Sequence, residues 1–312
     1  MLALTSATGK LGGAVLNAIL EHKLIDPKEL VVCTSTWPSS HRLSHLHAHS
    51  LTIRHADFSD PASLGTAYAG CTRLFLVSTP AIAMDYDSAP LWTGREAHHR
   101  AAIDAAVAAG VTHIYYTSLA FARPSCAAVM RAHVRTEAYL EGLQQRGVVG
   151  TTVMREGLYS ESWPLYLGYY FGLGAEKRTE VVVAGDGEVS WTAIADLGFA
   201  TAKVLAGEPQ RWVGKTFYLC QRVRRSLGDV ARVVGEVRGE EVGLKVVARR
   251  EFELYYVREM GMERAAVEWW SSTYEALERG ECAVEDGTLE GLLSEAGRTP
   301  VPVEVTIREM MK

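Results

Sequence analysis

The chain has 312 residues, of which 48% are hydrophobic and 22% are charged, and its formal net charge is −5. This balance is typical of a folded globular protein with one large domain or two closely joined domains, and it excludes fibrous and disordered chains. A negative net charge provides no basic field to hold nucleic acid or an anionic membrane, so we expect neither as a partner.

Short apolar runs alternate with amphipathic stretches through the first half of the chain. Strands are predicted at residues 2–5, 30–34, 51–54, 73–77, 112–117 and 151–155, and helices over residues 11–21, 62–69, 96–109 and 127–145. Because strands and helices alternate strictly, the pattern predicts βαβ units and a Rossmann-type, doubly wound parallel sheet with helices on both faces. The predicted fold class is therefore α/β.

The pattern changes after Arg155, where aromatic residues crowd the segment 159–171. Beyond it we expect strands at residues 180–183, 216–219 and 244–247, and helices over residues 195–205, 227–235, 250–260 and 264–278. These elements predict a nucleotide-binding Rossmann domain over residues 1–155 and a smaller, mixed α/β substrate lobe over residues 156–312. We expect the two to be interleaved, with the chain around 184–220 returning to the first sheet.

The sequence also constrains the location of the protein. No run approaches the roughly 18 uninterrupted apolar residues of a membrane span. Met1 leads almost directly into a glycine-bearing motif, so we expect no targeting segment. The five cysteines are scattered and form no CxxC pair, which favours reduced thiols over disulfides or a zinc site. These features predict a cytoplasmic protein.

A small-residue motif lies between the first predicted strand and the first predicted helix. Ser6, Gly9 and Gly12 have the spacing of a phosphate-binding turn, in which small residues let the backbone approach a pyrophosphate at a helix N-terminus. Gly9 would allow the close approach, and Gly12 close packing of the helix on the strand. Lys10 adds either a phosphate contact or a solvated charge.

The segment from Thr5 to Gly13 resembles the T-G-A-T-G-x-L-G motif of the NmrA-like branch of atypical short-chain dehydrogenases/reductases, which includes bacterial NAD(P)H:quinone oxidoreductases of this fold. Further matches follow in order at residues 54–57, 105–111, 116–119, 155–161 and 184–187. The resemblance covers residues 1–206 well and the C-terminal third loosely. Ser6 replaces the family's first glycine, and a positive φ there would cost about 1 kcal/mol or more.

The end of the second predicted strand indicates which dinucleotide is preferred. An acidic residue there would accept hydrogen bonds from the adenosine ribose and repel a 2′-phosphate, but residues 31–42 contain no Asp or Glu. We therefore expect NADP(H) in preference to NAD(H). The hydroxyls of Thr34, Ser35, Thr36 and Ser39, together with Arg42, would replace the arginine that the family often carries. The resemblance implies further cofactor contacts from Thr8, Leu11, Asp57, Phe58, Val77, Ser78, Thr79, Thr117 and Gly157.

A histidine-rich stretch follows the same strand. His41, His45 and His49 would share one face if the stretch were helical. A metal site needs convergent ligands with a carboxylate or thiolate behind them, and none is indicated here. We interpret the stretch as a solvated surface and predict no metal.

Ordinary short-chain dehydrogenases use a Tyr-x-x-x-Lys pair, in which the lysine lowers the pKa of the tyrosine acid. Here the corresponding positions are Val129 and His133, so the usual acid is missing, as in the atypical branch generally. The candidates that remain are Ser118, His133 and Tyr159. Each has a structural alternative, as a strand cap, a helix histidine and a core aromatic residue respectively.

Two further groups of residues lie near the predicted site. Arg155 and Glu156 are expected to form a structural pair. Aromatic residues at helical spacing are more often core than ligand-binding, yet the resemblance implies that the segment after residue 160 builds the substrate pocket. The substrate-binding candidates are therefore Trp163, Tyr166, Tyr170 and Trp191.

The sequence thus predicts an NADPH-dependent reductase that transfers hydride to a quinone or to an aromatic or conjugated ketone, with a small aromatic molecule as substrate. One alternative is a non-catalytic, NADP-sensing NmrA-like regulator. Another is a redox-neutral dehydratase or isomerase on the same scaffold, with His133 as base. Monomer and homodimer both remain possible.

Overall fold

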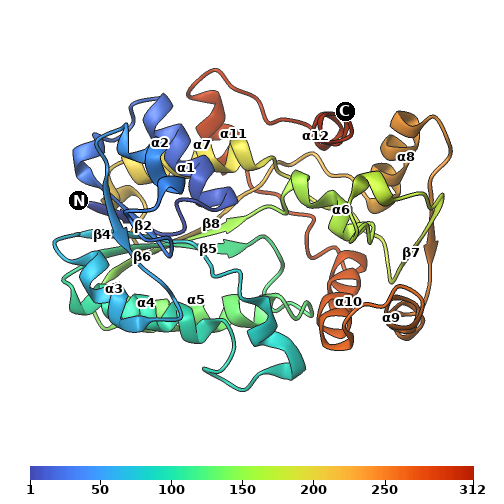
Figure 1. Cartoon of the computed structure of the whole chain (residues 1–312), viewed down its shortest axis with the longest axis horizontal. Coiled ribbons are helices and arrows are strands. Elements are labelled where there is room, and N and C mark those ends of the chain that lie inside the picture. The colour runs from blue at the N-terminus through green and yellow to red at the C-terminus, as the bar shows by residue number, and fades with distance from the viewer.

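The computed structural model describes residues 1–312 and contains two parts joined side by side (Figure 1). The larger part is built on seven parallel strands in the order β3-β2-β1-β4-β5-β6-β8. Their bounds are β1 (Leu2–Leu4), β2 (Leu30–Thr34), β3 (Thr52–His55), β4 (Arg73–Leu76), β5 (His113–Leu119), β6 (Gly150–Glu156) and β8 (Lys215–Leu219). The strand order reverses between β1 and β4, which is the arrangement of a doubly wound sheet.

Helices cover both faces of this sheet, as Figure 1 shows. One face carries α1 (Lys10–Glu21), α2 (Ser44–His47), α7 (Ile194–Ala206) and α11 (Thr288–Ser294), and the other carries α3 (Pro61–Tyr68), α4 (Glu96–Ala108) and α5 (Met130–Gln145). The central strands β1 and β2 are buried along their whole length, as expected of parallel strands covered on both sides. The predicted α/β fold with a doubly wound parallel sheet is confirmed.

The smaller part has its own core and a two-stranded parallel sheet of β7 (Glu180–Val183) and β9 (Gly243–Val246). Around this sheet lie α6 (Trp163–Tyr166), α8 (Leu227–Arg238), α9 (Arg249–Arg258), α10 (Arg264–Glu278) and α12 (Val303–Met310). Between β7 and β9 the chain returns to the larger part, where α7 covers the main sheet and β8 pairs with β6. The chain therefore passes from the smaller part to the larger part and back again.

Most predicted elements are found within one or two residues of their expected ends, but four helices were not predicted. These are α2, α6, α11 and α12. The last of them has a readable signal, because Pro302 precedes the helix and Val303, Thr306 and Ile307 are buried at helical spacing. The helix expected from residue 127 begins at Met130.

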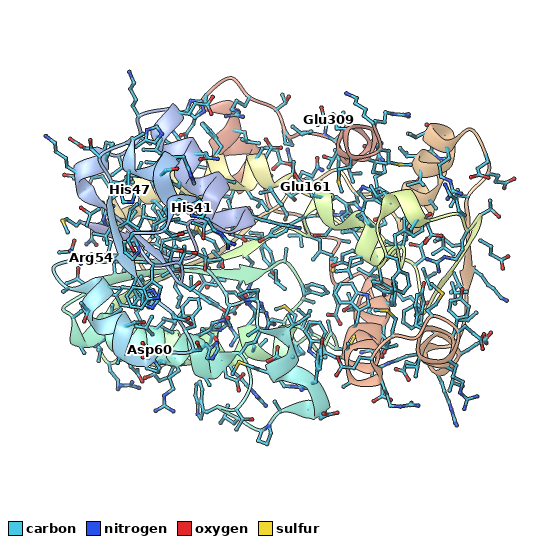
Figure 2. All side chains as sticks on the ribbon, in the orientation of Figure 1. His41, His47, Arg54, Asp60, Glu161 and Glu309 are labelled. Atoms are coloured by element: carbon cyan, nitrogen blue, oxygen red, sulfur yellow. The ribbon has the colours of Figure 1, made fainter.

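The structure has no helix that combines the length and the apolar character needed to cross a bilayer. All five cysteines are free, and no three side chains of the ligand-forming types converge as a metal site would require. The histidine-rich stretch is a 3₁₀ turn (His41–Leu43) followed by the short α2, with His41 and His47 drawn in Figure 2. His49 lies beyond the end of α2, so the three histidines do not share one helical face.

Candidate nucleotide-binding and active site

A cavity of about 670 Å³ opens at the carboxyl ends of β1, β2 and β4. This is the place where the strand order reverses, and open α/β sheets bind their ligands there. The cavity wall contains fourteen of the residues predicted from the sequence, namely Ser6, Thr8, Gly9, Lys10, Leu11, Gly12, Thr34, Ser35, Asp57, Phe58, Val77, Ser78, Thr79 and Tyr159.

The loop from Ser6 to Gly12 forms the floor of this cavity and begins α1. Gly9 is the N-cap and supplies no side chain to the helix, so the N–H groups of the first turn face the cavity without a capping partner. A Cβ atom on Gly12 would lie 2.2 Å from the Ser6 carbonyl oxygen, whereas one on Gly9 would lie 3.2 Å from it. Gly12 is therefore required for the helix to approach the loop, and the uncapped N–H groups suit an anion.

The residue at the family's first glycine position adopts the conformation that a glycine favours. Ser6 has φ of +52°, and its carbonyl accepts a hydrogen bond from the Gly9 N–H at 2.8 Å. A left-handed conformation costs a non-glycine residue about 1 to 2 kcal/mol. The loop thus keeps the phosphate-binding shape and stores strain at Ser6.

The cavity wall near the ends of β2 and β3 carries hydroxyl and aromatic side chains. The Thr8 and Thr34 hydroxyl oxygens lie 3.3 Å apart, and Thr34 Oγ1 also accepts a hydrogen bond from the Thr36 N–H. The Phe58 ring stacks at 6.3 Å on the ring of His98, which comes from α4 and also lines the cavity. No carboxylate follows β2, so nothing at this point repels a ribose phosphate.

Asp57 is the acidic residue of this wall, and it lies two residues after the end of β3. Its carboxylate accepts hydrogen bonds from the Ser59 hydroxyl and N–H, which lower the pKa of Asp57. Arg42 is exposed on the 3₁₀ turn after β2 and does not line the cavity. The predicted clamp from this arginine is therefore absent from the wall itself.

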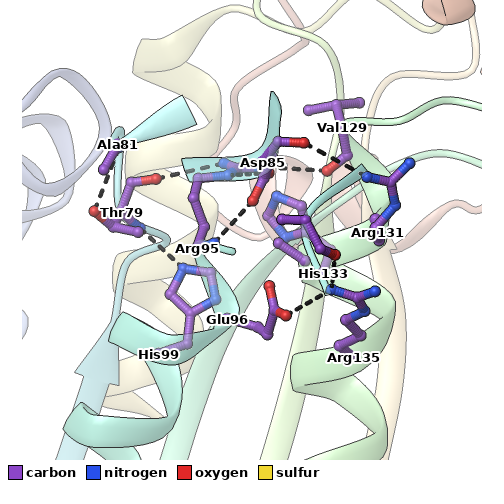
Figure 3. A network of polar contacts seen from close by, with 12 residues as sticks. Thr79, Ala81, Asp85, Arg95, Glu96, His99, Val129, Arg131, His133 and Arg135 are labelled. Carbon is purple, nitrogen blue, oxygen red and sulfur yellow. Dashed lines mark hydrogen bonds and ion pairs between the residues drawn. The ribbon is translucent and has the colours of Figure 1, made fainter. Parts of the chain in front are cut away.

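The segment after β4 is held by side chains from the first turns of α4 and from Arg95, the residue that precedes it, as Figure 3 shows. The Thr79 N–H donates to Nε2 of His99 at 3.1 Å, and the Thr79 carbonyl accepts from Nη1 of Arg95 at 3.4 Å. Burial lowers the pKa of His99 to about 3, so its ring is neutral and Nε2 remains an acceptor. Both backbone groups of Thr79 are thus fixed at the cavity wall.

Buried ion pairs secure the loop that leads from this wall to α4 (Figure 3). Arg95 contacts Asp85 at 2.7 Å, and its Nη2 also donates to the Val129 carbonyl at 3.0 Å. Arg135 of α5 contacts Glu96 at 2.7 Å. These contacts tie the loop to the start of α4 and to α5, on which the cavity wall rests.

Two of the three predicted catalytic residues face away from the cavity. Ser118 is buried, and its hydroxyl donates to Oε1 of Glu137 at 2.6 Å. His133 is buried against Tyr116, whose hydroxyl lies 3.0 Å from its Nδ1. Burial and the nearby Arg95 keep the pKa of His133 well below its usual range. Their assignment as groups that touch the substrate is corrected, because both side chains lie between β5 and α5, on the sheet face opposite α1.

Tyr159 lines the cavity, and its surroundings overturn a second expectation. Its hydroxyl donates to Oε2 of Glu156 at 3.4 Å. Arg155 pairs with Glu137 at 2.7 Å and not with Glu156, so the expected Arg155–Glu156 pair is wrong. Successive side chains of a strand point to opposite faces, and β6 includes both residues.

Two predicted cofactor-binding residues have structural contacts instead of a place in the cavity wall. Thr117 Oγ1 accepts a hydrogen bond from the Ser78 N–H at 3.0 Å. A Cβ atom on Gly157 would lie 2.2 Å from Oγ1 of Thr192, so this glycine allows two segments to pack closely. Neither residue lines the cavity.

The predicted aromatic substrate wall is mostly core. Trp163 and Trp191 have no exposed surface, and Tyr166 packs edge-to-face on Trp191 at 5.0 Å. These three assignments are corrected, because the smaller part of the protein uses the rings to fill its own core. Tyr170 is partly buried and packs on Tyr256 at 5.4 Å.

Sequence reasoning missed several residues of the cavity wall. They are Thr5, Cys33, Ala56, Ser59, Tyr68, Pro80, Ala81 and His98. Thr5 ends a predicted strand, and the rule that ligands bind at strand ends could have found it. His98 and Tyr68 come from helices, and only the packing of α3 and α4 brings them to this wall.

No family model matches the chain. An NmrA-like family domain-containing oxidoreductase of Aspergillus flavus is 29% identical over 319 residues, which cover 99% of this chain and 94% of the relative. Quinone oxidoreductase 2 of Escherichia coli is 29% identical over 256 residues, or 81% of this chain and 79% of the relative. The predicted resemblance to NmrA-like oxidoreductases is confirmed. With it the prediction of an oxidoreductase is confirmed.

Solved structures extend the likeness over the whole chain. The triphenylmethane reductase of Citrobacter sp., complexed with NADP(H), superposes with a TM-score of 0.79 at 26% identity and covers 99% of this chain and 100% of its own. A quinone oxidoreductase of E. coli complexed with NADPH gives a TM-score of 0.80 at 24% identity, with both chains fully covered, and supports the fold alone. The NADP(H) bound to the Citrobacter reductase agrees with the predicted preference for NADP(H).

Proposed function

We propose that this chain is an NADPH-dependent reductase that transfers a hydride to a quinone or to an aromatic or conjugated ketone. The observation that carries the proposal is the cavity between β1 and β4, where the strand order reverses. The uncapped N-terminus of α1 forms its floor, and Gly12 allows this helix to lie close to the loop. Bare N–H groups at such a position suit a pyrophosphate. The named activities of the relatives agree with the proposal.

The wall fits an extended dinucleotide, as three groups of residues suggest. The loop from Ser6 to Gly12 would hold the pyrophosphate. Thr34 and Ser35 would face the adenosine ribose, with Phe58 and His98 near the adenine. Val77, Ser78 and Thr79 would border the nicotinamide. NADPH supplies the hydride when bound, and the protein supplies position through the Thr79 backbone, which His99 and Arg95 fix.

Tyr159 is the proposed proton donor, because it is the one predicted catalytic residue that lines the cavity. The redox-neutral alternative with His133 as base loses support. The His133 ring is buried away from the cavity, and its Nδ1 lies within hydrogen-bond distance of the Tyr116 hydroxyl. Burial lowers the pKa of His133, which favours the neutral ring. One observation favours the NADP-sensing alternative. Ser118 and His133 both form hydrogen bonds within the protein, to Glu137 and Tyr116, so neither is free to act on a substrate.

Binding and turnover separate these functions. Titration calorimetry is expected to show tighter binding of NADPH than of NADH, and nicotinamide absorbance should fall when 1,4-benzoquinone is added. Ser35→Asp, which places a carboxylate after β2, should weaken NADPH binding more than NADH binding. Binding without oxidation by any member of a quinone and enone panel would replace the reductase with the sensor. If the protein binds neither NADPH nor NADH, the proposed nucleotide site is wrong.

We retain three further proposals that rest on the sequence. The domain boundary near residue 155, a cytoplasmic location, and a monomeric or homodimeric state all follow from the patterns described above. Light scattering after size-exclusion chromatography is expected to give one or two copies of the chain. A larger assembly would contradict the last of these.

A further inference from the structure

Five carboxylates are buried in this protein, and four of them have a guanidinium or a backbone N–H as partner. Asp85, Glu96 and Glu137 contact arginines, and Asp196 accepts a hydrogen bond from the Val301 N–H at 2.7 Å. Glu156 is the exception, with 1% of its surface exposed. Burying an ionised carboxylate without compensation is costly, so a group in this position is a candidate for function.

The surroundings of Glu156 offer its carboxyl a single polar partner. The residue ends β6 and pairs in register with Leu119 of β5 and Leu219 of β8, which are both apolar. Oε2 meets the Tyr159 hydroxyl at 3.4 Å, and Oε1 is buried without any partner. Arg155, the nearest cation in sequence, points to the other face of the sheet and contacts Glu137. The carboxyl is therefore aimed at Tyr159 alone.

We propose that Glu156 is a proton reserve for Tyr159, so that the two residues form a relay that ends at the cavity wall. The proposal rests on the proposed reductase and adds a residue to it. Glu156 would not touch the substrate, and would act as a positioning and proton-supplying residue through the Tyr159 hydroxyl. Tyr159 lines the cavity in which the reaction would take place.

The proposed step is balanced in atoms and electrons. The acceptor takes two electrons with the hydride, and its oxygen takes a proton from the Tyr159 hydroxyl as that O–H bond breaks. The resulting phenolate takes a proton from the Glu156 carboxyl, and the carboxylate is reprotonated from water after product release. When Glu156 carries its proton on Oε2, it donates to Tyr159, which leaves the phenolic O–H free to turn to the acceptor.

The electrostatics of the pair agree with this role. Burial raises the pKa of Glu156 well above its usual range, and Tyr159 is the only titratable group that faces it. Glu161, from the turn after Tyr159, adds a negative charge near the tyrosine, and Lys10 of α1 lies near Glu161 in turn. Figure 2 places Glu161 where the two parts of the protein meet. No Lys, Arg or His forms an ion pair with Glu156, so the protonated form is the stable one near neutral pH.

The test compares Glu156→Gln, Tyr159→Phe and the double variant in NADPH oxidation by 1,4-benzoquinone. Each single change is expected to lower kcat by about 10²-fold, the low end for general acid catalysis, while NADPH binding is retained. Because the residues act as a unit, the double variant should lose no more than either single one. Wild-type kcat should fall as pH rises through the raised pKa of Glu156, and this limb should be absent from Glu156→Gln.

Glu281→Gln is the matched control. Glu281 also has a buried carboxyl oxygen without a partner, but it lies outside the cavity wall and accepts a hydrogen bond from the Cys126 N–H. This variant should keep the wild-type kcat and pH profile. If Glu156→Gln also keeps both, the relay is wrong while the reductase stands. If the wild type binds NADPH but reduces no acceptor, the proposed function falls and the relay falls with it.

Discussion

The two halves of the main sheet's carboxyl edge are built in opposite ways. At the ends of β1, β2 and β4 the edge is hollow, and backbone groups, hydroxyls and glycines face a cavity. At the ends of β5 and β6 the edge is filled, and Ser118, Glu137 and Arg155 meet in a buried network. The hollow half thus leaves backbone groups open to a ligand, whereas the filled half compensates its charges internally.

Glu156 and Tyr159 lie between these halves. Glu156 belongs to the filled half by its place on β6, yet it lacks the compensation that its neighbours have. Tyr159 reaches the hollow half. The contrast between compensated and uncompensated carboxyls can be tested by four substitutions, whose expected effects decrease in the order given.

Glu137→Ala should cause the largest loss of stability. It would leave Arg155 buried without its partner at 2.7 Å and would also remove the acceptor of the Ser118 hydroxyl. Removing one member of a buried pair costs about 3 to 5 kcal/mol. Urea unfolding followed by circular dichroism measures the free energy of unfolding. The control is Glu236→Ala, which removes an exposed ion pair with Arg308. If Glu137→Ala costs no more stability than this control, the buried ion pairs do not stabilise the filled half.

Gly12→Ala should damage the hollow half. The new Cβ would meet the Ser6 carbonyl oxygen at 2.2 Å, and forced overpacking costs about 1 to 3 kcal/mol. NADPH affinity, measured by calorimetry, should fall as well, because the loop and the first turn of α1 must separate. Gly291→Ala, where no atom lies within 4 Å of the new Cβ, should leave binding unchanged. Equal affinities for the two variants would refute the close-approach role of Gly12.

Glu156→Gln should change the pH dependence of stability. The pKa of Glu156 is raised in the folded protein above its ordinary value of 4.5, so its stabilising contribution is fully present below that pH and is lost as pH rises through the folded pKa. Each unit of pH in this window changes the free energy of unfolding by about 1.4 kcal/mol for one proton. The variant should therefore gain stability relative to wild type as pH rises from 4.5. Parallel stability curves would mean that Glu156 is ionised when folded.

Ser6→Gly should produce the smallest effect. Glycine adopts φ of +52° without the strain that serine carries, so stability should rise by about 1 kcal/mol or less. Ser35→Gly is the matched control, because Ser35 lines the same cavity without a positive φ and should lose stability. Thermal unfolding of both variants gives the comparison. A loss of stability in Ser6→Gly would show that the serine side chain outweighs the backbone strain.

Local patterns in the sequence predicted the elements and the phosphate-binding loop. Apolar runs of strand length and amphipathic stretches of helix length gave strands and helices close to their observed ends, since both periods are properties of the chain itself. The predicted position of the loop between β1 and α1 is also observed. The direction of side chains at the ends of β5 and β6 was harder to predict. Ser118 and His133 were assigned by position along the chain, and the structure turns both into the filled half.

The α/β class, the order of the elements and the resemblance to NmrA-like oxidoreductases could all be predicted without a structure, because they depend on residue periodicity and on motifs contiguous along the chain. Tertiary structure alone decided which polar groups are compensated. Glu137 gains its arginine from a different element, whereas Glu156 lies among apolar neighbours from β5 and β8. The burial of a side chain and its hydrogen-bond partners depend on residues distant in sequence. No local pattern could therefore show that Glu156, the last residue of β6, faces only Tyr159 at the cavity.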